Sequence, residues 1–438
     1  FWTSALFMKI LQNESFVPMR LVSIFSTIAT LGVIYGYTRW LLRRSGLPKE
    51  STRVWGIIAA GVLLSAYRFT GAWFDIERLD MLFVALTMGG IFLLDTSVEG
   101  DELGLKCSPW RATGGVILLS LAFFTKQQAI LVILGSLGAL IWMKRWKLVT
   151  LVTLESLVFC AGGMWLLNRA TDGWFGFYCF KVPLGNGIQA NLITQFFKTD
   201  LLLFAPMIAL TVLGWLKLRP MLEQKDRMSL TLFGALVATS LLGSLLSRAH
   251  WGGDTNVLIP AYLILGMCGV ITAAHVSSKL SSAAGAVNFM LAAQMLLLFY
   301  LPMAQVPTEA NVKAGEMYQK LVHATENFGP VLCIDHGSFT HPPHFHVLGL
   351  LDILRAEKQM PLAISDALRQ HKYAAIFTDS KPSSTGMLAD IAINYPNTVN
   401  MLMPDTWVVT GFLTPGPNRS VWVSTPDLGP KDFKLPPP

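Results

Sequence analysis

The sequence predicts a mainly α-helical membrane protein, with a polytopic helical bundle of about ten spans followed by a small extracytoplasmic α/β domain. Of its 438 residues, 53% are apolar and 14% are charged, whereas soluble domains have about 25% charged residues. The mean hydropathy is +0.49, and the apolar residues form runs near the roughly 20 residues that cross a bilayer as a helix. This composition excludes an ordinary soluble enzyme. The net charge of +7 is typical of basic cytoplasmic loops, so nucleic acid is not an expected partner.

The first 18 residues differ from the spans that follow. The chain opens with the apolar segment FWTSALFMKIL, without an initiator Met and without the basic region of a signal peptide. We therefore expect the native N-terminus to lie upstream. Residues 1–18 are predicted to form a juxtamembrane helix on the outer membrane surface, as a remnant of a first outer loop.

Ten apolar runs predict a transmembrane domain at 19–303. They cover residues 19–42, 54–70, 80–95, 113–124, 128–143, 148–167, 200–216, 228–247, 257–275 and 284–302. The fourth and fifth runs are short and are separated only by Thr125, Lys126 and Gln127. They form either a helical hairpin or one broken helix.

Basic residues predict the orientation, because Lys and Arg next to spans are retained in the cytoplasm. They gather in alternate loops: Arg39, Arg43, Arg44, Lys49 and Arg53; Lys106 and Arg111; Lys144, Arg145 and Lys147; Lys217, Arg219, Lys225 and Arg227; and Lys279. This alternation predicts a multi-pass protein of the cytoplasmic (inner) membrane, with everything after about Pro302 outside.

Residues 304–438 are predicted to form the extracytoplasmic α/β domain. Strand-like segments at 331–335, 374–379, 407–412 and 420–425 alternate with helical segments that end near Ala356 and cover about 361–371. The Pro-rich end KLPPP is predicted to be a disordered tail.

A histidine cluster in this domain raises the question of a metal. Asp335, His336, His341, His344 and His346 lie within about a dozen residues and include zinc-ligand types. The two prolines between them and the lack of helical spacing favour a surface loop, so no metal site is assigned.

Polar residues at the outer ends of the spans are the candidates for a functional site, because ionisable groups at membrane depth are costly. They are Arg68, Asp75, Glu77, Arg78 and Asp80; Lys126, Gln127 and Gln128; Arg169, Asp172, Tyr178 and Lys181; and Arg248, His250, Asp254 and Asn256. Loops on one face can converge on one cavity. Cations gathered there are suited to a phosphate, such as that of a lipid-linked sugar.

Several of these residues also have a purely structural interpretation. Asp75, Glu77 and Asp80 lie where a helix starts, and acidic residues stabilise helix N-termini. Arg78 has the i, i+3 spacing for a local pair with Asp75, and the segment 250–256 could be only a tight turn. Lys126 has no carboxylate nearby in sequence, which favours a functional role.

Four segments carry a resemblance to a known family. They are WFDIERLDMLFVAL, TKQQA between two short runs, HWGGDTNVLIPAYLI, and the opening stretch from FW to NESFVPMRLVS. In order and topology they resemble bacterial multi-spanning glycosyltransferases of the GT-C fold, and are similar to protein O-mannosyltransferases and lipid A aminoarabinose transferases. The resemblance covers about residues 1–300.

The resemblance implies transfer of a sugar, with inversion, from a polyprenyl-phosphate donor to a glycan, lipid or protein acceptor outside the membrane. A carboxylate would take the proton of the acceptor hydroxyl while the lipid phosphate leaves. Protein cations can stabilise that phosphate, so no cofactor and no obligatory divalent metal is implied.

By position, the resemblance implies that Lys126 and Arg248 bind the lipid phosphate, with Arg78 as the next candidate. The family's principal acidic residue lies in a loop that would precede Phe1. Asp75 and Asp80 are then the nearest carboxylates for catalysis, and without the preceding loop the chain is expected to be inactive. The remaining residues assigned to substrate binding are Gln127, His250, Asp254 and Asn256.

Two other classes of protein remain open at this point. A transporter or flippase for a lipid-linked or anionic substrate would line its path with the same charges, but no inverted repeat is evident. A scaffolding membrane protein would not need clustered charge at the outer face.

Overall fold

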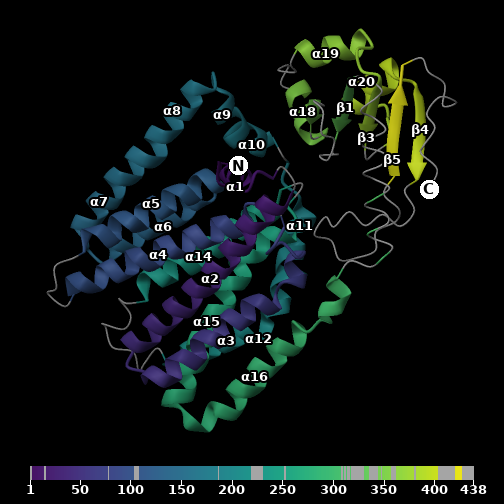
Figure 1. The fold of residues 1–438 in the computed structure, drawn as a ribbon. Coiled ribbons are helices and arrows are strands. Elements are labelled where there is room, and N and C mark those ends of the chain that lie inside the picture. The colour runs from purple at the N-terminus through teal and green to yellow at the C-terminus, as the bar shows by residue number, and fades with distance from the viewer. Residues whose placement is uncertain are drawn as a thin grey trace. The chain divides into compact units, whose positions relative to one another are not determined.

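The computed structural model describes residues 2–13, 16–76, 78–102, 108–185, 187–218, 230–250, 253–306, 309, 312, 316, 330–334, 344–346, 348–356, 362–378, 381–402 and 420–426. The chain divides into two compact units, Phe1–Tyr300 and Leu301–Pro438, both drawn in Figure 1. The fold is mostly helical with one small sheet.

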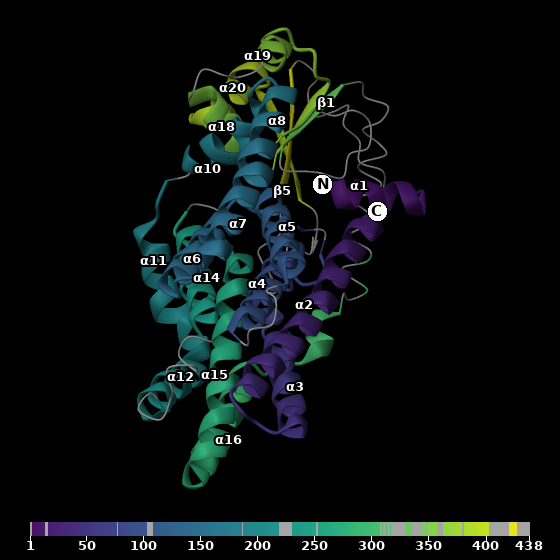
Figure 2. The same cartoon turned by 90° about the vertical axis from the view of Figure 1, so that its left-hand side faces the viewer.

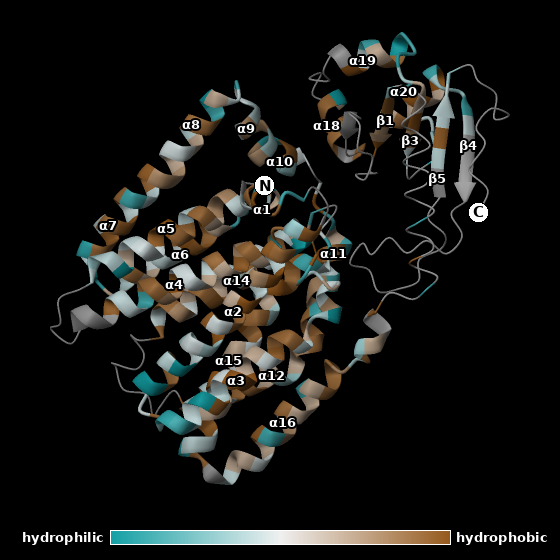
Figure 3. Ribbon diagram, viewed as in Figure 1, coloured by the Kyte–Doolittle hydropathy of each residue, from teal (hydrophilic) through white to brown (hydrophobic). Residues whose placement is uncertain are grey.

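The described residues of the first unit form helices, with one isolated bridge between Ile188 and His250. In chain order they are α1 (Trp2–Leu11), α2 (Phe16–Arg44), α3 (Lys49–Ser65), η1 (Arg68–Thr70), α4 (Asp80–Glu102), α5 (Pro109–Thr125), α6 (Ala129–Trp142), α7 (Trp146–Ser156), η2 (Leu157–Gly162), α8 (Gly163–Ala170), α9 (Trp174–Gly176), η3 (Phe177–Lys181), α10 (Val182–Gly185), α11 (Ala190–Gln195), η4 (Phe196–Asp200), η5 (Leu201–Phe204), α12 (Ala205–Leu218), α14 (Thr231–Arg248), η7 (Thr255–Leu258), α15 (Ile259–Lys279), η8 (Ser281–Ala283) and α16 (Ala284–Leu297). Hydrophobic residues dominate along these helices in Figure 3.

Among the described residues, six helical segments are long and apolar enough to cross a membrane. They are Val17–Arg44, Asp80–Val98, Trp146–Ala170, Ala190–Leu218, Thr231–Arg248 and Thr255–Lys279. Helices α3 and α5 have 17 residues each, and α6 and α16 have 14 each. A helix of 14 residues is about 21 Å long, short of a hydrocarbon core of about 30 Å. Six of the ten predicted spans therefore correspond to helical segments of spanning length and composition among the described residues, and the other four correspond to shorter helices.

Helix α15 occupies the centre of the first unit. Nearly nine-tenths of its spanning window is buried, and it packs against α12, α14, α2, α3 and α16. Figure 2 shows it between α12 and α3. By contrast, only 17% of the corresponding window of Trp146–Ala170 is buried. That segment exposes apolar side chains such as Leu154 and Val158, as expected of a surface that faces lipid.

The runs around Lys126 form a helical hairpin. Helix α5 packs antiparallel to α4, and the two backbones approach closely at Gly90 and Gly115, where an added Cβ at Gly115 would lie 2.8 Å from the Gly90 carbonyl oxygen. Helix α6 packs against α14, with Gly135 beside Thr239 and Gln128 bonded to Ser247. Both helices of the hairpin therefore meet at the end of the bundle where α4 begins.

The second unit contains a five-stranded mixed sheet in the order β2-β1-β3-β5-β4. The strands are β1 (Val331–Ile334), β2 (His344–His346), β3 (Ala375–Thr378), β4 (Asn397–Leu402) and β5 (Ser420–Thr425), and the helices of this unit are η9 (Pro302–Gln305), α18 (Leu348–Ala356), α19 (Leu362–Arg369) and α20 (Gly386–Asn394). Strand β1 pairs in parallel with β2 and β3, whereas β5 pairs antiparallel with β3 and β4. The short runs VLCI and AIFT are buried at every position, which is typical of central parallel strands.

The predicted strands at 331–335, 374–379 and 420–425 are present, and so are the two predicted helices. Strands β2 and β4 and helix α20 were not predicted, because they are short or carry polar residues. The predicted strand at 407–412, the tail, and Asp335, His336 and His341 lie outside the described residues.

Candidate functional site

Asp80 is the centre of a polar cluster at the end of the helical bundle. This carboxylate is 4% exposed, and its Oδ1 atom accepts hydrogen bonds from Lys126 Nζ at 2.5 Å and from Asn256 Nδ2 at 2.9 Å. The Lys126 ammonium also lies 6.0 Å from the centre of the Phe83 ring. Three segments far apart in the sequence thus meet at one carboxylate. Lys126 has no acidic residue near it in sequence, but Asp80 is its partner in the folded structure.

Local backbone geometry explains why Lys126 reaches this position. Helix α5 ends at Thr125, and Lys126 is extended, with φ −145° and ψ 124°. The next helix starts three residues later, so the side chain of Lys126 projects from the turn of the hairpin. Asp80 is the first residue of α4. The structural interpretation of Asp80 as an acidic residue at a helix N-terminus is compatible with its contact to Lys126.

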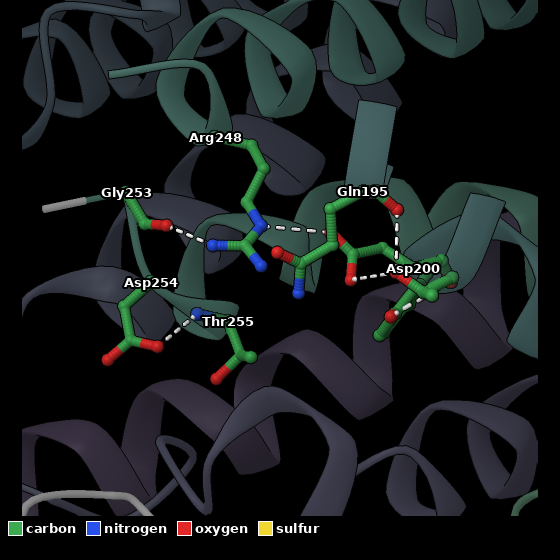
Figure 4. Close-up of polar contacts among 8 residues, drawn as sticks. Gln195, Asp200, Arg248, Gly253, Asp254 and Thr255 are labelled. Atoms are coloured by element: carbon green, nitrogen blue, oxygen red, sulfur yellow. Dashed lines mark hydrogen bonds and ion pairs between the residues drawn. The ribbon is translucent and has the colours of Figure 1, made fainter. Parts of the chain in front are cut away.

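Arg248 forms a second, more deeply buried cluster, drawn in Figure 4. Its Nε atom donates to Asp200 Oδ2 at 2.9 Å, with 7% and 9% of the two side chains exposed. Its Nη1 atom donates to the Gly253 carbonyl, and Tyr262 donates its hydroxyl hydrogen to the Asp200 carbonyl at 3.1 Å. The sequence analysis missed Asp200, although a single carboxylate at the start of an apolar run was a signal for it.

Asp254 lies on the segment that joins the two clusters. Its Oδ1 accepts the Thr255 backbone N–H at 2.6 Å, and the same segment supplies Gly253 to Arg248 and Asn256 to Asp80. Burial raises the pKa of the Asp254 carboxyl above its ordinary value, and the Thr255 hydrogen bonds and the charges of Arg248 and Arg78 offset this only in part. A carboxyl group with a raised pKa beside charged partners is a candidate for a functional role.

Asp75 has a different environment from Asp80. Its carboxylate accepts hydrogen bonds from Arg20 Nη2 at 2.5 Å and from the Tyr67 hydroxyl at 2.8 Å. Arg20 Nε also donates to the Asp75 carbonyl at 3.0 Å. These contacts attach the segment before α4 to α2, which favours a structural role for Asp75.

The expected local pair between Arg78 and Asp75 is not formed. The guanidinium carbon of Arg78 lies 4.9 Å from the centre of the Trp73 ring instead, because Asp75 is occupied by Arg20 and Tyr67. Arg78 is exposed, and its charge acts on Asp254. Glu77 lies outside the described residues.

The remaining predicted site residues are Gln127 and His250. Gln127 is half-buried in the turn of the hairpin, and its carbonyl accepts the Ile130 N–H at 3.0 Å. His250 pairs through its backbone with Ile188. The structure thus gathers Asp80, Lys126 and Asn256 directly and connects them to Arg248 and Asp254 through the segment 253–256.

A cavity of about 20 Å³ lies one helical turn along from Asp80. It is bounded by α4, α6, α14 and α15, and its lining includes Phe83, Thr87, Gln128, Ser240 and Leu263. The Thr87 hydroxyl is buried without a hydrogen-bond partner among the described residues. A cavity of this volume holds about one water molecule. It is therefore too small to bind a substrate.

Within the described part of the chain, no group of three or more His, Cys, Asp or Glu side chains is arranged to hold a metal ion. The two clusters present carboxylates, amides and cations. Neither the known protein families nor the curated proteins nor the solved structures yield a match to this chain.

Proposed function

We propose that the chain is a membrane glycosyltransferase that moves a sugar from a polyprenyl-phosphate donor to an acceptor hydroxyl on the extracytoplasmic side of the cytoplasmic membrane. The observation that carries the proposal is the Asp80–Lys126–Asn256 cluster at one end of an apolar helical bundle. Ionisable groups in such a place are costly and usually serve a substrate or an ion. The sequence resemblance to GT-C glycosyltransferases supplies the class of reaction.

Lys126 is the residue proposed to bind the phosphate of the donor. Its side chain is 23% exposed, compared with 7% for Arg248, so it is accessible from the end of the bundle while Arg248 is enclosed. The single hydrogen bond between Lys126 and Asp80 leaves further ammonium hydrogens for phosphate oxygens. Arg78, which is exposed on the segment before α4, provides a second cation.

The role of Arg248 changes in this proposal. Both Arg248 and Asp200 are buried, and the pair is completed by Gly253 and Tyr262. A buried arginine with these partners is better suited to fixing the segment 253–256 than to binding a substrate phosphate. We therefore assign Arg248 a positioning role.

Asp254 is the proposed general base, in place of the carboxylate that the resemblance assigns to a loop before Phe1. The proposal therefore includes sugar transfer by this chain, whereas the resemblance alone led us to expect inactivity. The acceptor oxygen would lose its proton to a carboxylate as it attacks the anomeric carbon, while the bond from that carbon to the phosphate oxygen breaks. The departing lipid phosphate gains negative charge, which Lys126 and Arg78 would stabilise. Burial raises the pKa of Asp254, which makes this carboxylate a better proton acceptor than an ordinary aspartate.

The test is transfer of labelled sugar in proteoliposomes that contain the full chain. Donors are polyprenyl phosphates carrying mannose or aminoarabinose, and both label transferred to acceptor and label released to water are measured. Lys126→Ala is expected to lower the rate by about 10² or more, comparable to the loss of one oxyanion donor. The matched control is Arg53→Ala, which removes a cation from an exposed pair with Glu50 and is expected to leave the rate unchanged.

The outcome also separates transfer from transport. Movement of labelled donor across the bilayer without release or transfer of sugar would replace the proposal with a flippase. Equal rates for Lys126→Ala and Arg53→Ala would remove Lys126 from the site.

A further inference from the structure

A basic pocket lies at the C-terminal end of α2. It has a volume of about 470 Å³ and is lined by Gly36, Arg39, Trp40, Arg43 and Arg44. The N-terminal end of the same helix contacts the segment before α4, through Ser23 to the Arg78 carbonyl and Thr27 to the Phe74 carbonyl. A helix of 29 residues is about 43 Å long, enough to reach both interfaces of a bilayer. The pocket and the Asp80 cluster are therefore at opposite ends of the bundle.

The charge of Arg39 is not neutralised by its partners in the described part of the chain. Its Nη1 donates to the Tyr35 hydroxyl at 3.0 Å, and its guanidinium carbon lies 4.9 Å from the centre of the Tyr35 ring. Its Nε atom is buried without a hydrogen-bond partner among the described residues. Arg20 and Arg248, by contrast, both pair with carboxylates. A buried donor without an acceptor is unfavourable, and an oxygen-bearing anion in the pocket would supply the acceptor.

Arg43 and Trp40 add to the same environment. Arg43 is exposed, and its side chain makes no hydrogen bond or ion pair with a described residue. The Arg44 guanidinium carbon lies 5.2 Å from the centre of the Trp40 ring. Tryptophan is enriched at the level of lipid headgroups, and arginine binds phosphate oxygens in a bidentate manner.

The helix macrodipole does not account for this arrangement by itself. Basic residues are stabilised in the last turn of a helix, and the effect falls off within that turn. Arg39 lies more than one turn before Arg44, where α2 ends, and it donates to a phenol and not to the terminal carbonyl groups.

We propose that this pocket binds the phosphate headgroup of an anionic phospholipid, with Arg39 and Arg43 as the principal ligands. The described lining residues all belong to α2, and clustered arginines at a membrane interface are suited to anionic headgroups. A volume of about 470 Å³ lies within the range of small-molecule sites. The site is independent of the proposed sugar transfer, because it uses other residues at the other end of the bundle.

The test is lipid binding to the delipidated full chain in detergent, followed by native mass spectrometry. The probes are phosphatidylglycerol, zwitterionic phosphatidylcholine and, in a separate arm, inorganic phosphate. We expect phosphatidylglycerol to bind and phosphatidylcholine to bind much more weakly. Since each Lys or Arg near an anionic lipid contributes roughly fivefold in affinity, Arg39→Gln/Arg43→Gln is expected to lower the affinity by about 25-fold.

Two further variants keep the test decisive. Arg43→Gln alone changes an exposed side chain, and it is expected to leave the fold intact and to lower affinity by roughly fivefold. Arg53→Gln removes an exposed arginine that pairs with Glu50 and is not among the residues that line the pocket. It is the matched control, with unchanged binding. Undiminished phosphatidylglycerol binding by Arg43→Gln would overturn the proposal. Inorganic phosphate that binds as tightly as the lipid would overturn the assignment to a lipid headgroup.

Discussion

The buried pair of Asp200 and Arg248 is expected to be a major contribution to the stability of the helical unit. Among the described residues, Asp200→Ala leaves the buried Arg248 side chain with the Gly253 carbonyl as its remaining hydrogen-bond acceptor. Removing one member of a buried pair costs about 3–5 kcal/mol. The two side chains are 7% and 9% exposed and bonded at 2.9 Å, so solvent does not compensate for the lost charge. At roughly 2–4 °C per kcal/mol, the variant is expected to melt at least about 6 °C below the parent protein.

The assay is thermal unfolding in detergent, with Arg53→Ala as the matched control. The Arg53–Glu50 pair has a similar length of 2.8 Å, but its side chains are 46% and 76% exposed, so its loss should cost only about 0.3–0.5 kcal/mol. Asp200→Leu/Arg248→Met removes both charges and is expected to recover most of the stability. The reasoning is refuted if Asp200→Ala melts with the control, or if the double variant is as unstable as Asp200→Ala.

Three other predictions concern the candidate site and the second unit. Lys126→Ala should lower both stability and sugar transfer. Adding Asp80→Asn should restore only stability, because it removes the carboxylate that Lys126→Ala leaves unpaired. Recovery of transfer as well would contradict a role for Lys126 in phosphate binding. Because the pKa of Asp254 is raised in the folded state, its stability contribution is present below the unfolded pKa and lost as pH rises through the folded pKa. Asp254→Asn should therefore raise Tm at neutral pH and abolish transfer, whereas an unchanged pH dependence of Tm would argue against a buried carboxyl. For topology, a cysteine introduced at Ser384 should react with an impermeant maleimide on intact cells. Cys333 should stay unreactive, because burial raises the pKa of its thiol to about 12. Labelling of the new cysteine only after lysis would place the second unit on the cytoplasmic side.

The class of the fold was predictable from local sequence. Runs of apolar residues form helices because a chain in hydrocarbon has to satisfy its backbone hydrogen bonds internally. Short apolar runs such as 331–334 form central strands, because parallel strands that are buried on both faces consist almost entirely of apolar residues. Span lengths were less predictable: hydropathy marks where apolar residues begin and end, but α16 stops at Leu297, short of the predicted end at 302.

Only the tertiary structure decided which charges meet. Lys126 and Asp80 are 46 positions apart, Asn256 is 176 positions from Asp80, and Arg248 is 48 positions from Asp200. The sequence identified all of these residues except Asp200, but it predicted none of these contacts, and the one local pair that its spacing allowed, Arg78 with Asp75, is not formed. The physical reason is that hydropathy and spacing describe each helix separately. Which side chains touch depends on how close approaches such as that of Gly90 and Gly115 set the relative positions of neighbouring helices.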